Sequence, residues 1–101
     1  MCLAQAKAVS IDGHPNPAYN GVYTHDSTHK GWPVLKNANG VYCYRHTLTD
    51  RWFLSPEFAP DKDGAFSFIA TADGPLAVGA HTWWVWVDKE WQKRTLTVTL
   101  Q

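Results

Sequence analysis

The stretch HTWWVWVDKEWQKRTLTVTL, residues 81–100, decides the fold class. In its second half Leu96, Val98 and Leu100 alternate with threonines, so the apolar residues face one way and the hydroxyls the other. This period of two is typical of a β-strand with one buried and one solvated face. The aromatic first half is separated from it by a polar break at 88–91, which predicts an antiparallel hairpin.

The aromatic half of this hairpin has no polar face. One face carries His81, Trp83, Val85 and Val87, and the other carries Thr82, Trp84 and Trp86. An apolar sheet surface is normally covered, and where it is not, it is a binding surface. We therefore expect residues 81–87 to form a central strand, with Trp84 and Trp86 beneath a second sheet, at a two-fold interface, or on a ligand-binding face.

Turn-forming pairs such as Asn20-Gly21, Lys30-Gly31 and Asn39-Gly40 recur along the chain, and no segment has a trustworthy helical period. Strands are predicted at 7–11, 21–25, 33–36, 41–46, 51–55, 65–71, 81–87 and 92–100. The strands at 33–36, 41–46 and 51–55 are predicted to form a three-stranded meander. The sequence predicts one all-β domain over residues 1–101: a small antiparallel sandwich or partly closed barrel of seven to eight strands built from hairpins. Residues 1–6 are expected to be disordered or to add an edge strand.

The tetrapeptide NGVY occurs at 20–23 and at 39–42, and each copy is followed by a Trp-led apolar run. Two units of about twenty residues are too few for a solenoid. We interpret them as two similar hairpins, in which Asn-Gly supplies the turn and Val and Tyr take alternate faces of the following strand.

Charge and hydropathy exclude several classes of partner. Nine basic and nine acidic residues give no net charge, which argues against nucleic acid and anionic membranes. No apolar run reaches eighteen residues, so no helical membrane insertion is expected. The segment MCLAQAKAVS lacks the features of a signal peptide, and the compartment stays open. Cys2 and Cys43 are expected to be free thiols, the alternative being a disulfide between the N-terminal segment and a strand.

The order of NG-x-Y, a W-P-V or W-F-L strand, Gly74-Pro75-Leu76, Gly79-Ala80-His81-Thr82-Trp83 and a final W…LTVT resembles small Trp-rich β-modules of large multidomain proteins of marine microbes. The resemblance spans roughly residues 19–99. It implies a non-catalytic, extracellular-type module and supplies no catalytic residues. This chain differs from those modules in standing alone.

Two segments resemble metal sites. His25, Asp26 and His29 could ligate a transition metal, but THDSTHKG looks like a hairpin loop, in which the i, i+4 spacing has no single-face geometry. The run Pro60-Asp61-Lys62-Asp63-Gly64 imitates the start of a calcium loop, but position 69 is Ile where a Glu is needed. We expect solvated turns at both places, and no metal or cofactor.

No residue pattern indicates catalysis. None of the serines, Ser10, Ser27, Ser55 and Ser67, lies in a G-x-S-x-G elbow. An enzyme would need a cleft in which His81 or His46 meets a carboxylate. We expect this protein not to be an enzyme.

The aromatic residues are the best candidates for a binding site. Exposed Trp and Tyr rings stack on the apolar faces of sugars, while polar side chains at the rim bind the hydroxyls. The candidate ligand-binding residues are Trp84, Trp86, Thr82, Tyr42, Tyr44 and Arg45, with Arg51 or Asp50 as further rim residues. The expected partner is a glycan or another surface ligand. The alternatives are that these rings form the core or a homodimer interface.

Overall fold

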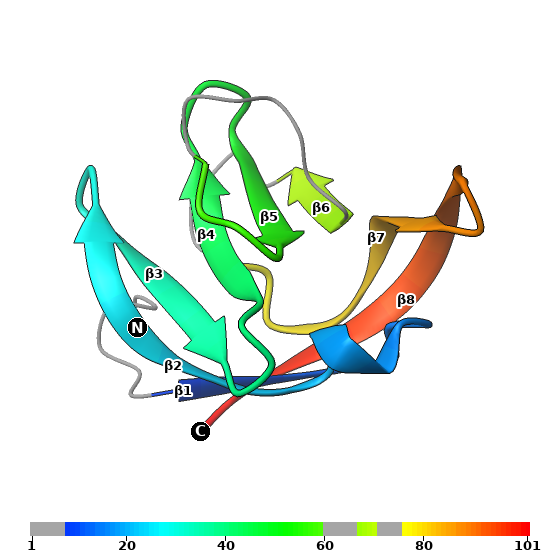
Figure 1. The fold of residues 1–101 in the computed structure, drawn as a ribbon, viewed down its shortest axis with the longest axis horizontal. Coiled ribbons are helices and arrows are strands. Elements are labelled where there is room, and N and C mark those ends of the chain that lie inside the picture. Colours follow the sequence, from blue (N-terminus) through cyan, green and yellow to red (C-terminus); the bar gives the residue numbers. More distant parts are fainter. Residues whose placement is uncertain (1–7, 60–66, 71–75) are drawn as a thin grey trace.

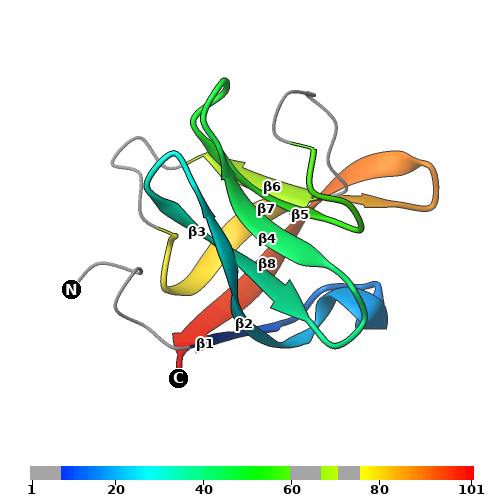
Figure 2. The same cartoon turned by 60° about the vertical axis from the view of Figure 1, so that its left-hand side comes forward.

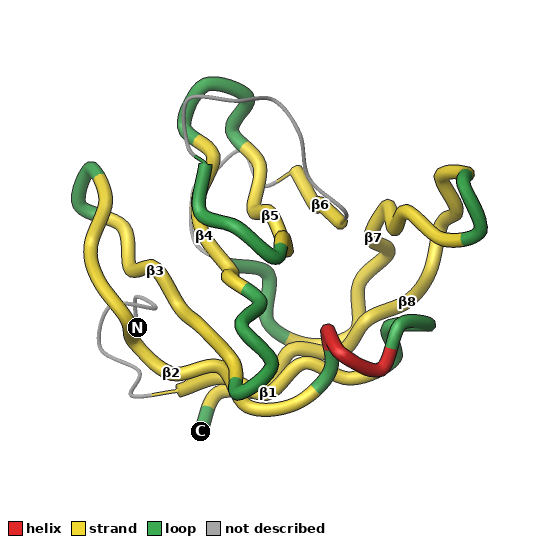
Figure 3. Tube along the Cα trace, viewed as in Figure 1, coloured by secondary structure: helices red, strands yellow, loops and turns green. Residues whose placement is uncertain are grey.

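The computed structural model describes residues 8–59, 67–70 and 76–101 of the chain. These residues form eight strands and one short 3-10 helix, η2 (Figure 1). The elements are β1 (Ala8–Asp12), η2 (Pro17–Tyr19), β2 (Gly21–His29), β3 (Trp32–Asn37), β4 (Tyr42–His46), β5 (Arg51–Ser55), β6 (Ser67–Ala70), β7 (Gly79–Val87) and β8 (Glu90–Leu100). Strand covers most of the trace in Figure 3. The predicted all-β class is confirmed. Residues 1–6, for which disorder or an edge strand was predicted, lie outside the described residues.

The eight strands close into one barrel. Each strand pairs antiparallel with the next in sequence, and β8 returns to pair with β1 (Figures 1 and 2). In this closing pair Val9 lies opposite Leu100, and Ile11 lies opposite Val98. The predicted barrel is therefore fully closed, and the alternative of a sandwich is wrong. Closure pairs the edges that an open sheet of the same strands would expose.

Tight turns join the strands where the sequence predicts them. The turn between β7 and β8 is Asp88-Lys89, with φ of 52° and 64°, and the turn between β2 and β3 is Lys30-Gly31, with φ of 51° and 83°. Positive φ at both central positions is the type I′ turn, whose twist matches that of the flanking strands. The predicted hairpin at 88–91 is thus confirmed. The predicted THDSTHKG loop is corrected, because β2 continues to His29 across a bulge between His25 and Ser27.

The barrel interior is filled by side chains from all eight strands, and β6 contributes Ile69, which packs partly buried against the core. Trp52 and Trp83 are the largest of them, and neither is exposed. The core also contains Val9, Ile11, Tyr19, Tyr23, Leu35, Val41, Cys43, Leu54, Leu76, Val85, Leu96 and Val98. Leu96 and Val98 face inward while the threonines of β8 face outward, as the alternation predicts. Cys43 is a buried free thiol, as expected; Cys2 lies outside the described residues.

A second cluster lies on the outer side of the barrel, over β3, β4 and β5. Val34, Tyr44 and Phe53 are buried there, and Phe58 from the segment after β5 packs against them. The Tyr44 and Phe58 ring centroids are 4.9 Å apart. We call Val34, Tyr44, Phe53 and Phe58 the covered cluster. A second, smaller hydrophobic cluster therefore lies outside the barrel, and its residues are buried although they face outward.

The two NGVY copies are not structurally equivalent. In the first, Val22 is exposed and Tyr23 is buried in the barrel. In the second, Val41 is buried and Tyr42 lies half-buried on the outer side, where Lys36 contacts its ring. Val and Tyr do take opposite faces in each copy, but the faces are exchanged between copies. The repeat marks turns and does not specify which face is buried.

Candidate ligand-binding site

Outward-facing aromatic rings gather where β6, β7 and β8 lie side by side. Trp84 and Trp86 on β7 are each 39% exposed, and Trp91 on β8 is 41% exposed. Phe68 on β6 is half-buried beside them. We call Phe68, Trp84, Trp86 and Trp91 the aromatic platform. The prediction that a second sheet covers Trp84 and Trp86 is wrong, because the described strands form a single barrel and leave both rings exposed.

Strand register assembles the platform. Phe68 lies opposite Trp84, and Trp86 lies opposite Trp91. Side chains directly opposite on antiparallel strands share a face and contact one another. The ring centroids of Trp86 and Trp91 are 5.4 Å apart, and those of Phe68 and Trp91 are 5.1 Å apart. Each pair meets edge to face, which is a favourable arrangement of aromatic rings, and a hollow lies beside Phe68 and Trp91.

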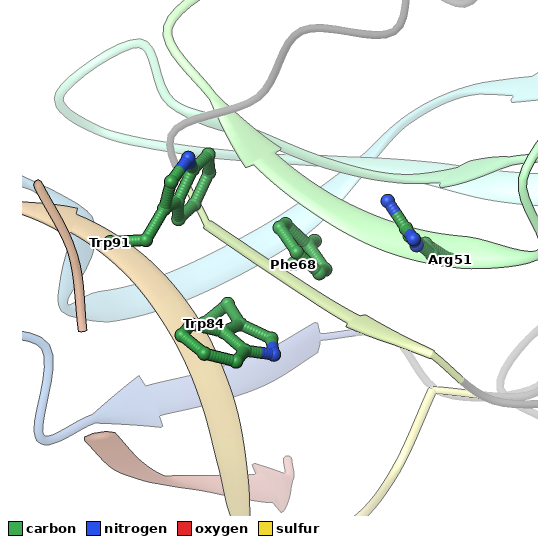
Figure 4. A pocket seen from close by; sticks show the side chains of 4 residues that line it. All are labelled: Arg51, Phe68, Trp84 and Trp91. Carbon is green, nitrogen blue, oxygen red and sulfur yellow. The ribbon is translucent and has the colours of Figure 1, made fainter. Parts of the chain in front are cut away.

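That hollow is an open pocket of about 400 Å³, lined by Arg51, Phe68, Trp84 and Trp91. In Figure 4 the two Trp side chains lie on one side, Phe68 lies between them and Arg51, and Arg51 forms the far end. The guanidinium carbon of Arg51 is 4.6 Å from the Phe68 ring centroid. The volume is within the range of small-ligand sites, roughly 300–1,000 Å³.

Three of the predicted site residues share this outer face. Trp84 and Trp86 belong to the platform, and exposed Thr82 precedes them on the same face of β7, opposite Thr95. The alternation of β7 therefore placed these side chains correctly. Trp83 and Val85, between them, face the core.

The other three predicted residues do not join the platform. Tyr44 is fully buried in the covered cluster, and half-buried Tyr42 packs against it. Arg45 is also buried, with its guanidinium 5.7 Å from the Trp32 ring and 3.4 Å from Asp50. The prediction that these residues share one exposed site is wrong. Phe58 packs against Tyr44, and Arg45 packs against Trp32, which is not part of the platform.

Residues that the prediction left out complete the site. Phe68 and Lys93 were not among the candidates, and Arg51 was considered only as a further rim residue. Lys93 could have been found: a two-residue turn at 88–89 places it opposite Trp84, where its ammonium lies 5.2 Å from the ring centroid. Phe68 could not, because the sequence between β6 and β7 does not fix their register.

A buried His–Ser pair lies away from the platform. His14 Nε2 is 2.6 Å from Ser67 Oγ, and the Asn16 amide donates to His14 Nδ1 at 2.9 Å. Because Nδ1 accepts, the neutral ring carries its proton on Nε2 and donates to the serine. Burial lowers the pKa of His14 to about 4. A general base must instead accept the hydroxyl proton, so this geometry does not activate Ser67.

The remaining candidate histidines contact hydroxyl and carbonyl oxygens, and the buried His46 Nε2 has no hydrogen-bond partner among the described residues. His81 Nε2 is 3.0 Å from the Val78 carbonyl oxygen, and His46 Nδ1 is 2.6 Å from Thr49 Oγ1. Within the described residues neither histidine hydrogen-bonds to a carboxylate, and no three metal-ligating side chains cluster. Exposed His25 contacts Thr28. The calcium-like segment 60–64 lies outside the described residues.

Comparisons with family models, curated proteins and solved structures found no match to this chain. The described part of the chain also contains no helix long and apolar enough to cross a membrane. The site's own geometry therefore has to support any proposal about function.

Proposed function

We propose that this protein is a non-catalytic binding module that holds a carbohydrate or a similar cell-surface ligand on the aromatic platform. One observation carries the proposal: Trp84, Trp86 and Trp91 are each about 40% exposed on one face, where Trp84 and Trp91 line a pocket and Trp86 packs against Trp91. Large rings left open on a small protein whose interior is already filled are available for a ligand.

The chemistry of the platform suits a sugar. Pyranose rings have apolar C–H faces that stack on indoles, and their hydroxyls bind polar groups at the rim. Exposed Thr82 and Thr95 continue the same outer face beyond Trp84 and supply hydroxyls there. The resemblance to Trp-rich modules of multidomain proteins supports the same non-catalytic role.

A homodimer interface is the competing explanation, because two copies could bury these rings against each other. Dilution distinguishes the ligand-platform explanation from the dimer-interface explanation. A ligand platform leaves the rings open to acrylamide quenching in a monomer, whereas an interface shields them until the dimer dissociates.

The test is a titration of tryptophan fluorescence against a glycan panel, run beside size-exclusion light scattering. We expect a monomer, saturable fluorescence changes with some glycans, and loss of at least ten-fold in affinity for Trp84→Ala. Leu48→Ala is the matched control, because Leu48 is also exposed but lies in the turn between β4 and β5. A monomer with no glycan bound, or equal binding by Trp84→Ala, contradicts the proposal.

A further inference from the structure

Two cationic side chains lie against rings of the aromatic platform. Arg51 reaches Phe68 from β5, with 4.6 Å between the guanidinium carbon and the ring centroid. Lys93 reaches Trp84 from β8, with 5.2 Å between its ammonium nitrogen and the ring centroid. Arg51 also lines the pocket. The platform therefore has positive charge contributed from two different strands.

Neither charge is neutralised by the described part of the chain. The ion pair found there joins Arg45 to Asp50, so it includes neither Arg51 nor Lys93. Glu90 lies on the hairpin of Lys93, but it is one residue from Trp91 and so on the opposite strand face, where it accepts from Gln92 at 2.8 Å. Within the part of the chain that the structure describes, the platform is thus a locally positive surface.

We infer that the ligand of the platform is an anionic saccharide, whose carboxylate or sulfate group binds Arg51 in the pocket while a sugar ring stacks on the indoles and Lys93 adds positive charge beside Trp84. This inference rests on the proposed carbohydrate-binding function. A guanidinium binds two oxygens of one carboxylate or sulfate group at once, and an ammonium adds a point charge. Hydrogen bonds to charged groups are stronger than neutral ones, so the acidic group adds affinity as well as selectivity.

A single-stranded nucleic acid also combines rings with anionic charge. Proteins that bind it follow the phosphate backbone with a continuous basic groove. Here Arg51 lines a pocket of about 400 Å³, which is the size of a small ligand, and Lys93 lies against Trp84, one of the lining rings. These dimensions favour a saccharide, and an oligonucleotide becomes a control in the test.

The test compares acidic oligosaccharides with neutral forms of the same backbone. Uronic-acid oligosaccharides are paired with their carboxyl-reduced forms, and sulfated ones with their desulfated forms, and affinities are measured by tryptophan fluorescence at low and high salt. We expect the acidic member of a pair to bind at least ten-fold more tightly, with the difference shrinking at high salt. The preferred pair tells a carboxylate ligand from a sulfate one.

Variants assign the effect to the two cations. Arg51→Gln and Lys93→Gln should each weaken binding of the acidic form several-fold and leave the neutral form unchanged, while Arg51→Lys should retain part of the preference. Arg94→Gln is the control, because exposed Arg94 lies beside Lys93 on the opposite strand face and binds Gln92. Circular dichroism establishes that each variant is folded.

The outcomes are distinct. Equal or tighter binding of the neutral forms overturns the charge inference and leaves the proposed function standing. If no saccharide binds at all, the proposed function fails with it. Tighter binding of a thymidine oligonucleotide, lost in Trp84→Ala and Arg51→Gln, overturns the inference in favour of nucleic acid.

Discussion

Trp83 and Trp84 are neighbours in the chain but belong to different regions of the molecule. Trp83 faces the barrel interior and has no exposed surface, whereas Trp84 faces outward and is 39% exposed. Strand alternation separates them completely. The interior ring packs in the core and the outer ring is open to solvent, so residue type alone does not tell which environment a tryptophan occupies.

The covered cluster lies between these extremes. Tyr44 and Phe53 face outward like Trp84, but they are as fully buried as Trp83, because Phe58 packs against Tyr44 while His46 and Phe68 pack against Phe53. Facing outward is therefore not enough to make a binding surface. The platform differs from the covered cluster in what lies on top of it, and the following predictions test that difference.

The largest effect is expected from Trp83→Ala. Removing a fully buried Trp from the core should lower the free energy of unfolding by about 3–5 kcal/mol, because the transfer energy is lost and a cavity remains. Urea denaturation monitored by circular dichroism measures the change. A loss below about 1 kcal/mol would show that the interior is not packed around this ring.

Truncating the covered cluster should come next. Tyr44→Ala should lower the free energy of unfolding by about 2–4 kcal/mol, since the residue is fully buried against Phe53 and Phe58. Tyr44→Phe is the control: it keeps the ring and removes only a hydroxyl 3.5 Å from the Ala59 carbonyl oxygen, so its effect should be small. Similar losses for both variants would contradict a packing role.

A pH dependence should arise from His14. Burial lowers its pKa from 6.5 to about 4, so between these values the unfolded chain binds a proton that the folded protein does not. Stability should therefore fall as the pH drops from 7 to 4, by on the order of 2 kcal/mol, and this contribution should level off below pH 4.

Comparison with His14→Gln isolates this contribution. Glutamine does not titrate, so the variant should lose less stability than the wild type over the same pH range, although it is expected to be weaker at pH 7. Thermal unfolding at several pH values provides the measurement. Parallel curves for the two proteins would mean that other groups cause the acid sensitivity.

The smallest effect on stability should come from Trp84→Ala. Because much of this ring is already in solvent, the free energy of unfolding should fall by only about 1 kcal/mol, whereas the proposed ligand binding should be lost. The same urea experiment as for Trp83→Ala gives the comparison directly. Equal destabilisation by the two variants would remove the distinction between interior and platform.

Sequence patterns located the strands well, because local signals determine them. The alternation of Leu96 and Val98 with threonines and the Asn-Gly turns indicated strand positions and hairpins. The two faces of β7 were also predicted correctly, with Trp83 on one and Trp84 on the other. What alternation cannot tell is which outward face a later segment covers, and this is why Tyr44 was expected in the exposed site.

Contacts between segments distant in sequence were harder to predict. No local sequence pattern indicates that β1 pairs with β8, so the sequence alone does not distinguish a closed barrel from a sandwich. The position of Phe68 beside Trp84 depends on the register between β6 and β7, and the sequence of the segment that joins these strands does not determine that register. Arg45 and Arg51 are the same residue type on neighbouring strands, and the sequence does not distinguish them. Only the packed structure shows that Arg45 lies over Trp32 while Arg51 lines the pocket.

The seam between β1 and β8 has a consequence for the order of folding. Seven of the eight pairings join strands that are consecutive in sequence, but Val9 must find Leu100, 91 positions further along. Local hairpins can form early, whereas this pairing must overcome the chain entropy of nearly the whole domain. We expect closure to be the last and slowest step, and the seam to be where amide hydrogens of the barrel exchange first.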